Sequence, residues 1–266
     1  MKKIGFFTSI GLLLAIFFLG CQSRGVSASN DEKRAWSDSV VYYTEQVRQG
    51  DREAYLNLAR SYHDEKESVE LRSLRMLSVA LAAEKRGTLG TVQYVFEPLP
   101  DDDSVKKLYN VVKLISEGQY KEAVTHGDEF EKIGLPRKLI DAFVLMDQWK
   151  CDEVAPMFDS LAEQGGAIAR VCSAYIVSEK DSSDIESLLM VADDFPLFYN
   201  RIARRYVEKG NHAQAAAYYL KADSCACLDK DGILFLLEYD ESLSSSSEKK
   251  ITSGEIERLK NLAKDL

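Results

Sequence analysis

The feature that most limits the fold of this chain is an apolar pattern that returns at a nearly constant interval. The segment 215–222 carries Ala, Tyr and Ala at positions i, i+4 and i+7, the spacing of one face of an α-helix. The same spacing begins at Ile185, 30 residues earlier, and at Val154, a further 31 residues back. Ala123 lies another 31 residues back. A constant interval of this length predicts a series of similar helical units stacked on one another.

The composition also favours helices. Hydrophobic residues make up 45% of the 266 residues, with 13 Tyr and 11 Phe, which is typical of a chain with a packed core. Only five Pro interrupt it, and good helix formers are frequent. We therefore expect an all-α fold.

The segment 199–222 resembles the tetratricopeptide repeat. Its first half has a large residue, an aliphatic–small pair and a Tyr; a Gly follows, and then Ala, an aromatic residue and Ala. These are Tyr199, Ile202, Ala203, Tyr206, Gly210, Ala215, Tyr219 and Ala222. Cys227 stands where the family usually closes its repeat with Pro. The resemblance implies an α-solenoid of antiparallel helix pairs.

Breaks in the pattern suggest the domain limits. We expect a signal peptide at 1–20, a small and polar lipid-anchored linker at 21–34, N-terminal helical repeats at 35–97 and tetratricopeptide-like repeats at 104–240. The Pro- and Asp-rich stretch 97–104 forms the joint between the two sets of repeats. A capping box of Thr252 and Glu255 begins a final capping helix, 252–266.

The first residues have the organisation of a secretory signal. Lys2 and Lys3 precede an apolar run at 10–19, which is shorter than the roughly 20 residues that a membrane span needs. Gly20 followed by Cys21 resembles the lipobox of bacterial lipoproteins, although Phe18 stands where Leu is usual. The resemblance implies a diacylated Cys21 as the mature N-terminus. Ordinary secretion is the alternative.

The same resemblance indicates a location. Gln22 follows the anchor where Asp would retain many lipoproteins in the inner membrane, so the outer membrane is favoured. Whether the body faces the periplasm or the outside stays open.

The charge limits the classes of partner. Removal of residues 1–20 takes away two Lys and no acid, so the net charge falls from −9 to −11. An acidic body argues against nucleic acid, which requires a surplus of Lys and Arg. It also argues against adhesion to anionic lipid heads, so attachment to the membrane depends on the acyl chains.

We find no motif for catalysis, a metal or a cofactor. His63, His126 and His212 lack metal-ligand spacing to any Cys, and solvent-facing His is the favoured interpretation. The run 101–103 of three Asp lacks the alternation of a calcium loop and is better explained as a helix cap. The sequence has no phosphate loop and no nucleophile elbow. We expect that the protein is not an enzyme.

Four Cys remain besides the anchor: Cys151, Cys172, Cys225 and Cys227. If Cys151 and Cys172 lie on antiparallel helices, they are offset along the helix axes by about six residues. That offset is roughly 9 Å, which is beyond disulfide reach. Cys225 and Cys227 are too close for an easy bridge and too sparse for a metal site. Buried or unpaired thiols are favoured, and any disulfide stays open.

The resemblance to the tetratricopeptide repeat also suggests a binding groove, lined by the first helix of each repeat. The corresponding positions here are Leu108, Val112, Leu139, Phe143, Arg170, Ala174, Asn200 and Arg204. A peptide with a hydrophobic segment and an acidic group or C-terminus would suit them. The alternative is that the apolar members are ordinary core between repeats.

These observations favour a membrane-anchored lipoprotein that binds a protein or peptide in the bacterial envelope. A structural subunit of an envelope assembly is the second hypothesis. An enzyme whose site the sequence does not reveal is the third.

Overall fold

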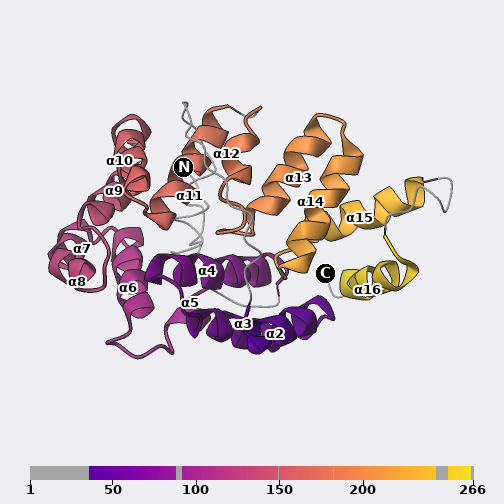
Figure 1. Cartoon of the computed structure of the whole chain (residues 1–266), viewed down its shortest axis with the longest axis horizontal. Coiled ribbons are helices and arrows are strands. Elements are labelled where there is room, and N and C mark those ends of the chain that lie inside the picture. The colour runs from indigo at the N-terminus through magenta and orange to yellow at the C-terminus, as the bar shows by residue number, and fades with distance from the viewer. Residues whose placement is uncertain (1–35, 88–91, 149, 182, 244–250, 265–266) are drawn as a thin grey trace, which may run out of the picture. The chain divides into compact units, whose positions relative to one another are not determined.

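The computed structural model describes residues 36–87, 92–148, 150–181, 183–243 and 251–264. Over these residues the chain forms fifteen helices and no strand (Figure 1). The prediction of an all-α fold is confirmed. The signal peptide, Cys21 and the linker lie outside the described residues.

The chain divides into two compact units that are discontinuous in sequence. Unit 1 contains Lys66–Leu74 and Thr91–Asp194, and unit 2 contains Asn30–Glu65, Arg75–Gly90 and Phe195–Leu266. The boundary falls inside one helix, α4 (Val69–Lys85), whose first turns belong to unit 1 and whose remainder belongs to unit 2.

Unit 2 is built around two helical hairpins. Its other helices are α2 (Asp38–Arg48), α3 (Ala54–His63), α13 (Phe198–Glu208), α14 (His212–Ser224), α15 (Lys230–Ser242) and α16 (Ser253–Lys264). Helix α2 packs on α3 and α13 on α14, and α15 follows α14 and is covered by α16 (Figure 1). Ala203 and Ala215 are fully buried in the α13–α14 hairpin. Small side chains at these positions allow the two helix backbones to approach closely.

Unit 1 holds the remaining helices. These are α5 (Gln93–Phe96), α6 (Ser104–Ser116), α7 (Tyr120–Thr125), α8 (Gly127–Lys132), α9 (Lys138–Asp147), α10 (Cys151–Glu163), α11 (Ala167–Lys180) and α12 (Glu186–Leu189). Helix α10 packs on both α9 and α11, and α6 packs on α7 and α9. The fully buried Phe130, Leu139 and Phe158 lie in its core.

One turn conformation ends five of the described helices. Gly50, Gly118, Gly134, Gly165 and Gly210 each have a positive φ, between 71° and 95°, two residues after the last residue of α2, α6, α8, α10 and α13. In each turn the Gly N–H donates to the carbonyl three residues back, and the next N–H donates to the carbonyl five residues back. This is the hydrogen-bond pattern of the Schellman motif, which Gly adopts without the cost of a Cβ.

The helix lengths are less regular than the apolar interval. The copy at 185–192 folds as only one turn of helix, α12, and turns follow it up to the start of α13. The copy at Ala123 ends at Thr125, and α8 begins anew at Gly127. A Cβ on Gly127 would lie 2.5 Å from Nε of Arg137, so the break permits a close side-chain approach.

Both helix caps expected from the sequence are present. The Thr252 N–H donates to the Glu255 carboxylate at 3.0 Å, and the Glu255 N–H donates to Thr252 Oγ1 at 3.2 Å, which is the reciprocal capping box. The Asp103 carboxylate accepts the N–H groups of Val105 and Lys106 at the start of α6. The acidic run therefore includes a helix cap, as expected.

Candidate functional site

Arg170 lies in a network inside unit 1. It projects from the first turn of α11, where its Nη1 donates to the Gly165 carbonyl at 2.9 Å and its Nη2 donates to Asp194 at 3.2 Å. Its side chain is 38% exposed. Arg170 is thus oriented by internal contacts while one part of it still faces solvent.

Asn200 and Arg204 lie one helical turn apart on α13, in unit 2. Asn200 is buried and bridges two backbone groups, since its amide donates to the Cys227 carbonyl at 2.7 Å and its oxygen accepts the Asp229 N–H at 3.2 Å. Arg204 Nη2 pairs with the buried Asp229 and, at 3.3 Å, with Asp231. Asn200 therefore fixes the turn before α15, and Arg204 pairs with two carboxylates at the start of that helix.

The apolar residues expected in the groove are mostly part of the core. Leu108, Leu139, Phe143 and Ala174 are all buried, and the Phe143 ring lies 6.3 Å from the Phe158 ring. Only Val112 is half-buried. The structure places these five side chains in unit 1 and therefore favours the alternative that the apolar set is core. Among the expected groove residues, exposed polar groups come from Arg170 and Arg204, which belong to different units.

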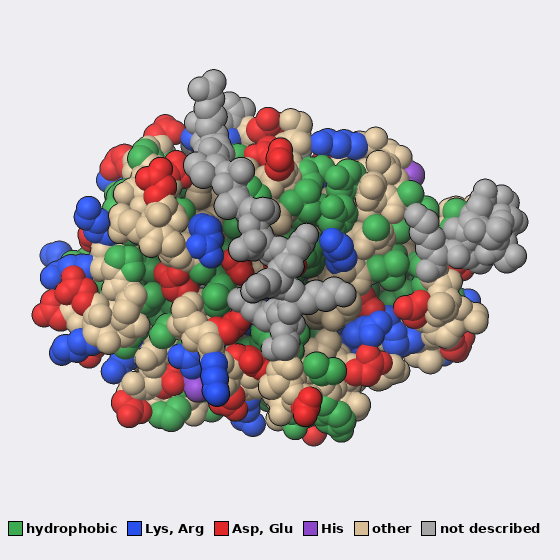
Figure 2. Space-filling model, in the orientation of Figure 1, with side chains coloured by type: hydrophobic (Ala, Val, Ile, Leu, Met, Phe, Trp, Pro, Cys, Tyr) green, Lys and Arg blue, Asp and Glu red, His purple; other side chains and the backbone are tan. Residues whose placement is uncertain are grey.

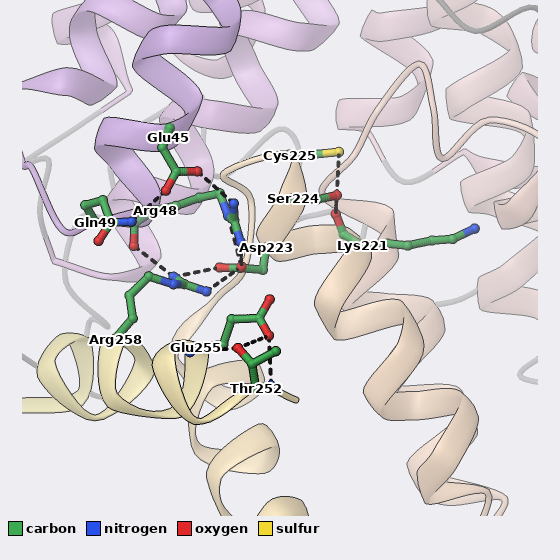
Figure 3. Close-up of polar contacts among 10 residues, drawn as sticks. All are labelled: Glu45, Arg48, Gln49, Lys221, Asp223, Ser224, Cys225, Thr252, Glu255 and Arg258. Atoms are coloured by element: carbon green, nitrogen blue, oxygen red, sulfur yellow. Dashed lines mark hydrogen bonds and ion pairs between the residues drawn. The ribbon is translucent and has the colours of Figure 1, made fainter. Parts of the chain in front are cut away.

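A buried acid between two arginines is the strongest polar cluster of unit 2, and the sequence did not indicate it. Asp223, at the end of α14, is 2% exposed in its side chain. Arg258 of α16 donates to both Asp223 oxygens, at 3.2 and 2.6 Å, and Arg48 of α2 donates from Nε at 3.1 Å (Figure 3). Burial lowers the pKa of Arg48, but the carboxylates of Asp223 and Glu45 together outweigh burial and the pKa is raised.

A second buried acid lies at the start of α11. The Glu70 carboxylate accepts the N–H of Ala167 and, at 3.4 Å, the N–H of Ile168. Helix α11 has no cap from Gly166, which precedes it, so Glu70 provides the cap from 97 residues away. Burial raises the pKa of Glu70, and the two N–H groups and Arg170 offset part of that rise.

The chain matches no protein-family model, no curated protein and no solved structure. What these clusters do must therefore be argued from their geometry.

The remaining chemistry-bearing residues do not converge on one place. Over the described parts of the chain, no three His, Cys, Asp or Glu side chains come together as metal ligands. Among the described residues, Cys172, Cys225 and Cys227 form no disulfide, and burial raises the pKa of Cys172 and Cys227. The side chain of Cys151 lies outside the described set.

The surface and the helix lengths add two further facts. Acidic and basic side chains are interspersed over the face that Figure 2 shows. In the part of the chain that the structure describes, we find no helix with the length and apolar character of a bilayer span.

Proposed function

We propose that this protein is a lipoprotein, anchored through Cys21, whose tetratricopeptide-like α-solenoid body binds a protein or peptide in the bacterial envelope, with the outer membrane as the favoured location. The anchor rests on the resemblance of residues 1–21 to a lipoprotein signal. The adaptor role rests on the helix pairs of the part of the chain that follows the linker.

The repeated helical turn is the observation that carries the adaptor role. Five helices end in the same Gly-based hydrogen-bond pattern and are each followed by another helix. The helices that flank four of these turns pack as pairs in α2–α3, α6–α7, α10–α11 and α13–α14. Arrays of such pairs expose long surfaces that bind extended partners.

Arg170 and Arg204 are our candidates for contact with an acidic group of the partner. Arg204 uses a single nitrogen, Nη2, for both Asp229 and Asp231, and its side chain is 34% exposed. Asp231 is 70% exposed, so a partner carboxylate can replace it with little loss of buried contact. A planar guanidinium binds a carboxylate best through two nitrogens. Arg170 in unit 1 is 38% exposed and also pairs through Nη2 alone, although its partner Asp194 is less exposed, at 21%.

The test is capture of partners from membranes by mild crosslinking, read by mass spectrometry. The double variant Arg170→Lys and Arg204→Lys keeps both positive charges beside Asp194 and Asp229 but removes the planar forks. We expect it to lower capture of the main partner about tenfold, a loss of roughly 1.4 kcal/mol.

Arg137→Lys is the matched control. Arg137 is 52% exposed and pairs with the exposed Asp128 at 3.4 Å. We expect this variant to capture partners like the wild type. Undiminished capture by the double variant would remove Arg170 and Arg204 from the binding surface, and capture of no partner by the wild type would contradict the adaptor role.

A further inference from the structure

Helix α16 is attached to unit 2 through few buried groups. Leu259 is its one fully buried side chain among the described residues, while Ile256, Leu262 and Ala263 are half-buried. These apolar residues recur at the three- and four-residue spacings by which an amphipathic helix lies in a groove. Leu262 lies against the turn after α2, where a Cβ on Gly50 would be 3.0 Å from its Cδ2.

Arg258 is the polar anchor of α16. Besides the two bonds to Asp223, its Nη1 donates to the Arg48 carbonyl at 2.8 Å. Its guanidinium side chain is only 9% exposed. Figure 3 shows Arg258 reaching from α16 to Asp223, with Arg48 on the other side of the carboxylate. A bidentate pair of this kind adds both energy and orientation.

The surface beneath α16 does not depend on Arg258 for its charge balance. Asp223 also pairs with Arg48, whose Nη2 lies 3.1 Å from Oδ2, and Arg48 pairs in turn with Glu45 at 2.7 Å. Departure of α16 would therefore not leave Asp223 as a buried acid without a partner, the arrangement that costs most.

Helix α16 also supplies its own start. Its capping box consists of Thr252 and Glu255, both within the same segment, so the first turn of the helix requires no group from the rest of unit 2. The N-terminal turn of α16 therefore keeps its hydrogen bonds, and Asp223 keeps its ion pair with Arg48, when the helix and the surface separate.

We infer that the surface formed by Arg48, Gly50, Asp223 and α15, the α16-binding site, is a helix-binding site that α16 occupies in the free chain. It takes, in exchange, a partner's amphipathic helix that presents an Arg directly followed by a Leu, as Arg258 and Leu259 do. The Arg binds Asp223 and the Leu fills the position of Leu259. This inference depends neither on the lipid anchor nor on Arg170 and Arg204.

The test is binding of a fluorescent peptide with the sequence of residues 251–266 to the full chain in mild detergent, measured by anisotropy. In the chain, Arg258→Ala removes the bonds from α16 to Asp223 and so weakens the binding of α16 to its own site. We therefore expect the variant chain to bind the wild-type peptide at least tenfold more tightly than the wild-type chain does. A peptide that carries Arg258→Ala should bind the same variant chain at least tenfold more weakly.

Lys260→Ala is the matched control in the chain, since Lys260 is an exposed residue of the same helix. It should bind the peptide like the wild type. Equal binding of the peptide by the wild-type and Arg258→Ala chains would overturn the inference.

Hydrogen exchange on the wild-type chain provides a second measurement that does not depend on a variant that folds. If α16 leaves its site, its amides exchange well before those of α14. Exchange of both helices at one rate, that of unfolding of unit 2, would equally overturn the inference.

Discussion

Asp223 shows how one buried side chain holds together distant parts of a chain. Its two arginine partners come from the first described helix, 175 residues earlier, and from the last, 35 residues later. Pairing with arginine compensates this carboxylate for its removal from water, and Arg48 alone would still provide such a pair.

We expect Asp223→Asn to lower the free energy of unfolding of unit 2 by about 3–5 kcal/mol, because it takes from the buried Arg258 the carboxylate that it pairs with and leaves Arg48 with Glu45 alone. Urea denaturation followed by circular dichroism measures the change. Asp231→Asn is the control, since Asp231 is 70% exposed and an exposed pair contributes less than about 1 kcal/mol. Equal effects of the two substitutions would contradict the role given to Asp223.

Glu70 leads to a prediction about pH. Its pKa is raised above the ordinary 4.5, chiefly by burial, so the folded chain binds this proton more tightly than the unfolded chain. By linkage, the stability that this group contributes is present below pH 4.5 and is lost as the pH rises through the folded value. We expect Glu70→Gln to become progressively more stable relative to the wild type as the pH rises from 4.5 to 7.

Unfolding curves across this pH range measure the difference. Glu163→Gln, at an exposed position, is the control and should follow the wild type. The opposite result is a Glu70→Gln variant whose free energy of unfolding falls relative to the wild type as the pH rises. It would show that the N–H groups of α11 stabilise the charged carboxylate more than burial penalises it.

At the scale of elements, the Gly turns determine where helices end. Gly210 has φ 71°, and a Cβ there would meet nothing within 4 Å, so only the backbone conformation requires Gly. We expect Gly210→Ala to cost about 1 kcal/mol of stability. Gly254, in the first turn of α16, is equally open but has no positive φ, so Gly254→Ala should be neutral or stabilise by up to about 1 kcal/mol. Thermal melts that rank the two substitutions in the opposite order would contradict this explanation.

Many helices can be predicted from the sequence because their apolar spacing and caps are local signals. The apolar spacing of 199–222 and the capping box at Thr252 indicate α13, α14 and the start of α16. The apolar spacing at 185–192 predicts a longer helix than α12, which ends at Leu189, because such spacing does not report where a helix stops. Arg137 packs against Gly127, ten residues earlier, and no local pattern reports that contact.

At the scale of the molecule, the two units could not be predicted because both are discontinuous. Helix α4 is one continuous apolar pattern, yet its residues belong to both units. The long-range contacts could not be predicted either, because no sequence motif relates Glu70 to the start of α11, or Arg48 to Asp223. A position within a repeat identifies an inward-facing residue, such as Leu139 or Phe143, but not whether that residue meets core or solvent.

At the same scale, the proposed function requires a body held at a membrane through Cys21. Mass spectrometry of the N-terminal peptide of the native chain, purified from membranes, tests this most directly. We predict a peptide that begins at Cys21 and carries the mass of a diacylglyceryl group, and we predict that Cys21→Ser releases the chain from the membrane fraction. A native chain that begins elsewhere and carries no acyl group would contradict the anchor.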